Sequence, residues 1–243
     1  MRISPTHYAL RITHYALRIT TERHMPFSFG RVTQFSDRRD AGRQLAALLL
    51  KYKDDKPVVL ALPRGGVPVG YEIAQALNAP LDVFIARKLG APHQPELGIG
   101  AIAPGDVLIL DTETVRMLGI TDEEIKRIAE SERAEMERRL RRFRGDRPLP
   151  DVRGRTVILV DDGLATGVTA YAAIQSLRLS EPAKIVLAVP ICAAQTAQAI
   201  ASQVEALVCV RSPGNLGAVG LWYRDFEQTT DDEVVALLES SSK

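Results

Sequence analysis

Histidine is scarce in this sequence, and its scarcity excludes several kinds of catalysis. The chain of 243 residues has four histidines, and three of them lie before residue 25. Only His93 belongs to the body of the chain, where we expect a solvated loop residue. Serine–histidine catalysis and histidine-rich metal sites therefore have almost no residues from which to be built.

Cysteines, long apolar runs and excess charge are lacking as well. Cys192 and Cys209 lie among apolar neighbours without CxxC spacing, so we interpret them as buried, reduced thiols of a cytoplasmic protein. No stretch approaches about 18 consecutive apolar residues, which argues against a transmembrane helix. The formal net charge is +1, so we expect neither a membrane nor a nucleic acid as partner.

The first 25 residues differ from the rest of the chain. The heptapeptide THYALRI at 6–12 is repeated at 13–19, and two copies are too few for a repeat protein. Four arginines against one glutamate also make the segment basic, as in some targeting peptides. We expect residues 1–25 to be a leader outside the domain, disordered or artefactual, and we expect deletion of residues 1–24 to leave folding and ligand binding intact. The domain is expected over residues 26–243.

Predicted strands and helices alternate after the leader. Short apolar runs are typical of parallel strands buried on both faces; they lie at 57–62, 81–86, 156–161, 184–190 and 205–210, with weaker strands at 97–103 and 106–110. Helices are predicted over 40–52, 67–78, 121–145, 169–179, 195–203 and 231–239. The alternation predicts an α/β fold with a mainly parallel sheet flanked by helices and with one inserted long helix.

The long predicted helix at 121–145 has an uneven charge distribution. Acidic residues open it and arginines close it, an order that complements the helix dipole. The arginines are Arg138, Arg139, Arg141, Arg142 and Arg144. They could form a phosphate-binding or nucleic-acid-binding arm, but we favour a solvated helix that lies across the domain or at a dimer contact.

One stretch, VILVDDGLATGVTA at 157–170, joins an apolar strand to two carboxylates and a small polar loop. The loop offers backbone N–H groups with little side-chain bulk and leads into a helix N-terminus, which favours anions. Asp161 and Asp162 would repel phosphate, but they suit sugar hydroxyls or a metal ion. A phosphorylated sugar satisfies both halves of the motif.

Other nucleotide-binding motifs fit less well. A Walker loop requires a lysine after its second glycine, and no lysine follows Gly167. The segment 98–103 matches GxGxxA, but Pro104 and Gly105 come next, so no helix starts there. A dinucleotide-dependent enzyme would depend on that segment alone.

The stretch 157–170 closely resembles the phosphoribosyl pyrophosphate (PRPP) signature of type I phosphoribosyltransferases. In order along the chain, LPRGGVPVG at 62–70 resembles the pyrophosphate loop of that family, and 87–97 lies where the family has a mobile catalytic loop. The tail GAVGLWYRDF at 217–226 lies where the family has a small C-terminal hood that receives the base. The resemblance spans about 27–239 and is strongest to a bacterial group whose acceptor is unassigned.

The resemblance implies an activity and a role for each motif. The family transfers ribose 5-phosphate from PRPP to a nitrogenous base, usually with Mg²⁺ as cofactor, and releases pyrophosphate. Asp161 and Asp162 would hold the ribose hydroxyls and favour the positive charge of an oxocarbenium-like transition state. The residues implied to hold the 5-phosphate are Gly163, Leu164, Ala165, Thr166, Gly167 and Thr169.

The resemblance also implies a pyrophosphate site and a metal site. Arg64 and the amides of Gly65 and Gly66 would bind pyrophosphate, whose charge Mg²⁺ would neutralise. Members often have a cis peptide before the residue that matches Arg64, and the sequence leaves this open for its Pro63–Arg64 bond. Asp225, in RDF, loosely matches a tail aspartate that contacts Mg²⁺ in purine-salvage members, and Asp162 is a second candidate ligand.

The acceptor base is not defined by the resemblance. Ala165 stands where 6-oxopurine enzymes have an aspartate and where the adenine enzyme also has alanine. The adenine enzyme uses a loop glutamate, for which Glu96 is the candidate, although we favour the interpretation that Glu96 in QPELGIG simply starts a strand. Trp222 and Tyr223 would stack on a planar base or serve as core or dimer-contact aromatics.

Arg87 and Lys88 would cover pyrophosphate on loop closure or be ordinary surface charges. A regulatory protein of the same fold, which senses PRPP or a nucleotide without a required transferase step, is the alternative to the enzyme. The net acidic body of the chain, without a basic patch interleaved with aromatics, argues against RNA or DNA binding. A homodimer is the expected assembly.

Overall fold

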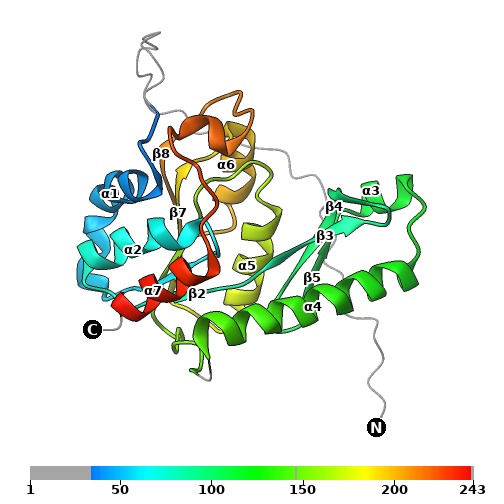
Figure 1. Ribbon diagram of the computed structural model, residues 1–243, viewed down its shortest axis with the longest axis horizontal. Coiled ribbons are helices and arrows are strands. Elements are labelled where there is room, and N and C mark those ends of the chain that lie inside the picture. Colours follow the sequence, from blue (N-terminus) through cyan, green and yellow to red (C-terminus); the bar gives the residue numbers. More distant parts are fainter. Residues whose placement is uncertain (1–33, 146, 242–243) are drawn as a thin grey trace.

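The computed structural model describes residues 34–145 and 147–241, and its centre is a five-stranded parallel sheet (Figure 1). The strand order is β2-β1-β6-β7-β8. These strands are β1 (Val58–Ala61), β2 (Leu81–Val83), β6 (Thr156–Val160), β7 (Lys184–Ile191) and β8 (Ala206–Arg211). The predicted leader lies outside the described residues, as do the first residues of the predicted domain. The α/β class with a mainly parallel sheet is confirmed.

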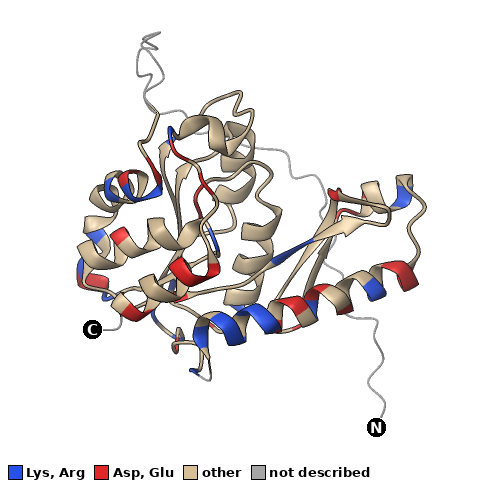
Figure 2. Ribbon diagram, in the orientation of Figure 1, with Lys and Arg blue, Asp and Glu red and all other residues tan. Residues whose placement is uncertain are grey.

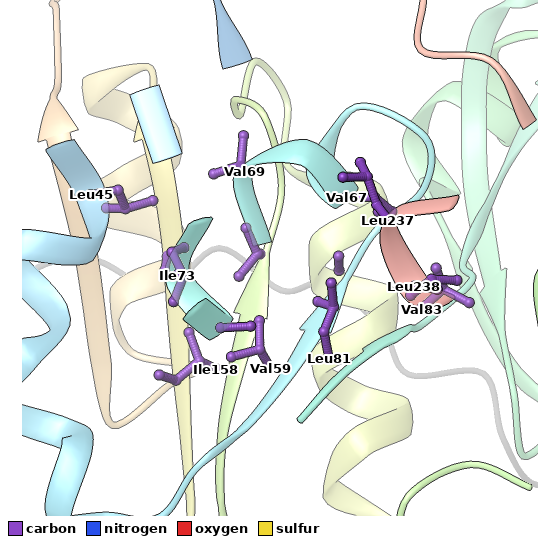
Figure 3. Packing of buried hydrophobic residues seen from close by; sticks show 14 of the residues in the cluster. Leu45, Val59, Val67, Val69, Ile73, Leu81, Val83, Ile158, Leu237 and Leu238 are labelled. Atoms are coloured by element: carbon purple, nitrogen blue, oxygen red, sulfur yellow. The ribbon is translucent and has the colours of Figure 1, made fainter. Parts of the chain in front are cut away.

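Both faces of this sheet are covered by helices, which explains why its strands are continuously apolar. Alternate side chains of β1 and β6 point to opposite faces and join two separate clusters of buried residues. One cluster, drawn in part in Figure 3, includes α1 (Arg38–Leu49), α2 (Gly66–Leu77) and α7 (Asp231–Ser241). The other includes α5 (Val168–Arg178) and α6 (Ala194–Ala201).

A second, three-stranded antiparallel sheet projects from the side of the domain with the long helix along it (Figure 1). Its strands are β3 (Arg87–Ala91), β4 (Gln94–Ala103) and β5 (Val107–Leu110); α3 (Thr112–Met117) and α4 (Asp122–Arg144) follow. We call the segment from β3 to α4 the arm. Its sheet packs on α4 through Ala129 and on α5 through Ala172.

The expectation of a loop over 87–97 was wrong, because most of that segment is paired as strands β3 and β4. Its glycines suggested a loop but are required by close strand packing. A Cβ on Gly90 would lie 2.3 Å from the carbonyl oxygen of Pro95, and one on Gly100 would lie 2.1 Å from that of Ile109. His93 is exposed in the turn between the strands, as predicted.

The inserted helix α4 begins with a capping box, in which the side chains of Thr121 and Glu124 bind each other's backbone amides. Figure 2 shows acidic residues near its start and arginines near its end. Arg141 is solvated as predicted, with 70% of its side chain exposed. Arg144 is not: its side chain is 10% exposed, pairs with Asp82 at 3.1 Å and donates to the carbonyl of Val83 at 2.6 Å. The end of α4 is therefore anchored beside β2.

The cysteines and the helices agree in part with the expectations from composition. Neither cysteine forms a disulfide; Cys192 is buried, as predicted, whereas Cys209 is only partly buried. Burial raises the pKa of the Cys192 thiol to about 12 and that of Cys209 to about 11, so both are protonated at neutral pH. Among the described residues, no helix combines the length and the apolar character that crossing a membrane requires.

Candidate functional site

A cavity of about 340 Å³ lies beyond the carboxyl ends of β1 and β6, beside the base of the arm. In open α/β sheets, ligands bind in this position. The cavity brings together two segments that the sequence singled out. Asp161 and Thr169 come from the 157–170 stretch, and Arg87 and Lys88 come from the 87–97 segment. The cavity also contains Arg139 of α4, which the sequence analysis had counted among solvated arginines. Three cations and one carboxylate give the cavity wall a net positive charge.

The loop between β6 and α5 presents unpaired amides to a ligand. The N–H groups of Ala165, Thr166 and Gly167 make no hydrogen bond to any other described residue. Gly167 adopts a left-handed conformation with φ of 71° and precedes the first turn of α5, whose amides point the same way as in helix N-termini that bind anions. The carbonyl of Ala165 accepts a hydrogen bond from the hydroxyl of Thr196, a supporting contact that the sequence analysis missed.

Leu164 has a structural role within the same loop. The residue is buried, with 3% exposure, and its amide already donates to the carbonyl of Ile191 at 2.9 Å. The expectation that this amide binds phosphate is therefore wrong. Gly163 is needed for packing, because a Cβ there would lie 2.5 Å from the side chain of Val219. Both residues hold the loop against β7 and the C-terminal segment.

Asp161 and Asp162 place two adjacent carboxyl groups at the end of β6. The amide of Asp162 donates to the Asp161 carboxylate at 2.8 Å. Burial raises the pKa of Asp161 well above its ordinary value, and the charge of Asp162 adds to the shift. Burial also raises the pKa of Asp162, although the guanidinium of Arg38 opposes this shift. A ligand that brings hydroxyl donors or positive charge next to these carboxyls would favour their ionised forms.

Arg38, the first residue of α1, holds Asp162 in place. Its Nε donates to the Asp162 carboxylate at 2.8 Å, and its Nη1 donates to the carbonyl of Glu227 at 2.6 Å. Its guanidinium carbon lies 3.9 Å from the ring centroid of Phe226. The side chains of Arg38 and Asp162 are only 12% and 17% exposed. This contact joins residues 124 positions apart, so no local sequence pattern indicates it.

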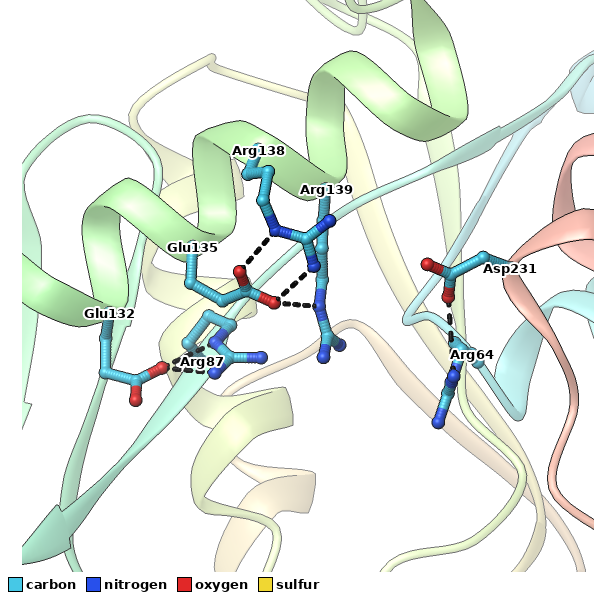
Figure 4. Close-up of polar contacts among 7 residues, drawn as sticks. All are labelled: Arg64, Arg87, Glu132, Glu135, Arg138, Arg139 and Asp231. Atoms are coloured by element: carbon cyan, nitrogen blue, oxygen red, sulfur yellow. Dashed lines mark hydrogen bonds and ion pairs between the residues drawn. The ribbon is translucent and has the colours of Figure 1, made fainter.

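The turn between β1 and α2 lies against Asp162. Its Pro63–Arg64 peptide is cis, which answers the question that the sequence left open. The amide of Gly66 donates to the carbonyl of Leu62 at 3.1 Å and is not available to a ligand, contrary to expectation, whereas the amide of Gly65 has no described partner. Arg64 pairs with Asp231 at the start of α7, with 3.4 Å between Nη1 and Oδ1 (Figure 4).

The base of the arm supplies the other cations. Arg87 pairs with Glu132 of α4, as Figure 4 shows, and its Nε donates to that carboxylate at 2.6 Å. The ammonium group of Lys88 donates to the carbonyl of Glu96 at 2.5 Å. Glu96 itself is exposed within β4, and its side chain does not line the cavity. The strand interpretation of Glu96 is therefore the right one.

The hood residues lie close to the site without lining the cavity. Tyr223 is 3% exposed and packs between Phe35 and Phe226, and its hydroxyl donates to the Asp162 carbonyl at 2.6 Å. Trp222 packs on the same cluster and donates from Nε1 to the carbonyl of Leu216. Tyr223 is therefore a core aromatic and Trp222 is partly buried against the same cluster, and neither lines the cavity where a base could stack on it. Asp225 is exposed, and its carboxylate accepts from the Glu227 amide.

The fold and the cavity define an α/β protein with a loop of unpaired backbone amides and two adjacent carboxyl groups at the carboxyl edge of its sheet. The family model described as phosphoribosyl transferase domain matches residues 31–219. The chain belongs to that family.

Named relatives support the assignment. The chain is 45% identical over 209 residues to two Mycobacterium tuberculosis proteins, named "Putative phosphoribosyl transferase MT0597" and "Putative phosphoribosyl transferase Rv0571c". These alignments cover 86% of this chain and 47% of each relative, so the chain spans about half their length. A solved structure, TT1426 from Thermus thermophilus, is 38% identical with a TM-score of 0.72. That match covers 85% of this chain and 98% of the other.

Proposed function

We propose that this protein transfers ribose 5-phosphate from PRPP to a nitrogenous base and releases pyrophosphate. The observation that carries the proposal is the cavity beside the 161–169 loop, where a carboxylate, a hydroxyl and three cations face one volume. Family membership agrees with this chemistry. A phosphorylated sugar with a pyrophosphate leaving group needs groups that accept hydrogen bonds from its ring hydroxyls, and it needs cations beside its pyrophosphate.

Each part of the site has a role in this reaction. The amides of Ala165, Thr166 and Gly167, with the start of α5, would hold the 5-phosphate. Asp161 and Asp162 would accept hydrogen bonds from the ribose hydroxyls and stabilise positive charge as the bond to pyrophosphate breaks. Arg87 and Lys88 would then stabilise the negative charge of the leaving group.

The described residues contain no cluster of three or more side chains that could hold a metal ion by themselves. Mg²⁺ in phosphate-handling sites is commonly bound by one or two carboxylates together with substrate phosphates and water. Asp161, which lines the cavity, fits that arrangement; Asp162 is paired with Arg38, and Asp225 lies outside the cavity. When bound with PRPP, Mg²⁺ would neutralise charge on the leaving pyrophosphate.

The regulatory alternative gains little from the arginines of α4. Arg139 and Arg138 pair with Glu135, and Arg142 pairs with Asp232. With Arg144 anchored on Asp82, most of the arginine-rich end is used in contacts within the chain. Such pairing leaves less unpaired positive charge for a polyanion.

The test combines a PRPP titration with a screen of purine and pyrimidine bases for pyrophosphate release. We expect Asp162→Asn to fold and to weaken PRPP binding or turnover at least about tenfold, equivalent to about 1.4 kcal/mol. Asp106→Asn is the matched control, because its side chain is 91% exposed on the arm and Asn tolerates its φ of 58°.

The outcomes separate the two functions. A wild-type protein that binds no PRPP contradicts both of them. Binding without pyrophosphate release for any base favours the regulatory alternative. If Asp162→Asn binds and turns over like wild type, the ribose role of Asp162 is wrong.

A further inference from the structure

The helix α4 carries charged residues on the face that it turns toward the domain. Met136 and Phe143 of this face are buried. Arg139 lies between them at helical spacing, three residues after Met136 and four before Phe143, where a third apolar residue would be expected. Its side chain is 26% exposed, against 70% for Arg141 two positions later. Arg139 therefore faces inward as a charged residue.

The contacts of Arg139 fix one side of its guanidinium and leave the other side for a ligand. Its Nε donates to Glu135 at 2.8 Å, and its two terminal nitrogens make no hydrogen bond to any described residue. In Figure 4 the guanidinium group extends past the Glu135 carboxylate, away from the axis of α4. Since Arg139 also lines the cavity, these terminal N–H groups are positioned to serve as donors there.

The other cations of the cavity wall differ in this respect. Arg87 uses its Nε and Nη2 on Glu132, and Lys88 donates to the carbonyl of Glu96. Arg139 keeps both terminal nitrogens of its planar fork, the geometry that binds phosphate oxygens in pairs.

Glu135 holds the guanidinium group of Arg139 in place by accepting the hydrogen bond from its Nε. Its carboxylate is shared between Arg138 and Arg139, and the hydrogen bond from Arg138 is the largest cause that lowers the pKa of Glu135 to about 2. The carboxyl is therefore ionised at every pH at which the protein would be assayed. One carboxylate between two guanidiniums leaves this cluster with a net positive charge.

We propose that Arg139 binds the pyrophosphate group of PRPP, so that the inserted helix contributes directly to the leaving-group site. This inference rests on the proposed function. Pyrophosphate is favoured over the 5-phosphate because Arg139 lines the same cavity as Pro63, Arg87 and Lys88, whereas none of the residues 165–167, whose amides make no hydrogen bond to a described residue, lines that cavity. Glu135 is a positioning residue that orients the guanidinium.

The experiment measures binding of inorganic pyrophosphate, ribose 5-phosphate and PRPP to the full chain by calorimetry. Loss of charge-assisted hydrogen bonds to phosphate predicts that Arg139→Gln weakens pyrophosphate and PRPP binding about tenfold or more. Ribose 5-phosphate binding should change less than about twofold, because its site lies on the 165–167 amides. Arg139→Lys should recover part of the lost affinity, since it keeps the charge without the fork.

Arg141→Gln is the matched control, because it removes the same charge from the same helix at a solvated position. It should leave all three affinities within about twofold of wild type. Equal losses in Arg139→Gln and Arg141→Gln, or equal losses for pyrophosphate and ribose 5-phosphate, would overturn the inference, because either result reports only a general electrostatic effect.

The inference and the proposed function can fail separately. If wild type binds pyrophosphate through Arg139 but transfers ribose phosphate to no base, the inference stands and the transferase proposal fails. If wild type turns over PRPP and Arg139→Gln matches it in every affinity, the transferase proposal stands and the inference is wrong.

Discussion

Replacing Gly65 by alanine should break the ion pair between Arg38 and Asp162. Gly65 has φ of −61° and ψ of −30°, which alanine adopts without strain, so the backbone itself tolerates the change. The new Cβ, however, would lie 1.9 Å from the Asp162 carboxylate oxygen that Arg38 binds, and 3.0 Å from Arg38 Nε. The carboxylate must therefore move away from the guanidinium.

The expected loss of stability follows from the burial of this pair. Breaking a fully buried ion pair costs about 3–5 kcal/mol. Because the side chains of Arg38 and Asp162 are 12% and 17% exposed, we expect Gly65→Ala to lower the free energy of unfolding by about 2–3 kcal/mol. For a domain of this size, that lowers Tm by roughly 4–12 °C. Gly214→Ala is the control, because no atom lies within 4 Å of the Cβ that alanine would add there and its φ is not positive.

A double-mutant cycle tests the cause of the effect. In the Asp162→Ala background the obstructing carboxylate is absent, so Gly65→Ala should cost less than about 0.5 kcal/mol by thermal or urea unfolding. If Gly65→Ala costs the same with and without the Asp162 carboxylate, the reasoning is refuted, and the turn at Gly65 resists alanine for another reason.

Two further predictions concern buried carboxylates. Burial raises the pKa of Asp161, which means that the folded protein favours the protonated form of this carboxyl. The stability that the protonated form contributes is fully present below the ordinary pKa of 3.8 and is lost as pH rises through the raised pKa. Without ligand, Asp161→Asn should therefore raise Tm at pH 7–8 by about 2–4 °C, which corresponds to a gain in stability on the order of 1 kcal/mol. The gain should shrink toward pH 4, and a gain that does not depend on pH would show that the charge of Asp161 is not its cause. Asp82→Asn should destabilise the protein by about 3 kcal/mol in urea unfolding, because it leaves the buried charge of Arg144 uncompensated. Asp232→Asn, which removes the exposed partner of Arg142, should cost less than about 0.5 kcal/mol, and equal effects would show that Arg144 is not effectively buried.

The loop after β6 and the parallel sheet could be predicted because their signals are local. Five short apolar runs became the five parallel strands, and the 157–170 stretch forms a strand, a loop with unpaired amides and a helix start in that order. Each of these features depends on side-chain size and polarity within a few neighbouring positions. The strand–loop–helix order of this stretch was thus predictable before any tertiary contact was known.

The arm and the supports of the site could not be predicted in the same way. Gly90, Gly98 and Gly100 have the composition of a loop, and only the approach of a neighbouring strand explains their presence in paired strands. Arg38 and Arg139 have no sequence feature that distinguishes them from other helix arginines. What sets them apart is a long-range partner or a cavity, which exists only after the chain has folded.

The position of β6 has a consequence for the order of folding. This strand lies between β1 and β7, and its pairing with β1 joins residues as distant as Val58 and Val157. Closing such a long loop costs conformational entropy before any contact compensates for it, and non-local pairing slows folding. The arm lies within that loop and makes its own antiparallel pairs between sequence neighbours, so it can form early and shorten the search. We therefore expect the arm, including the arginine that we assign to pyrophosphate, to form before the central sheet closes.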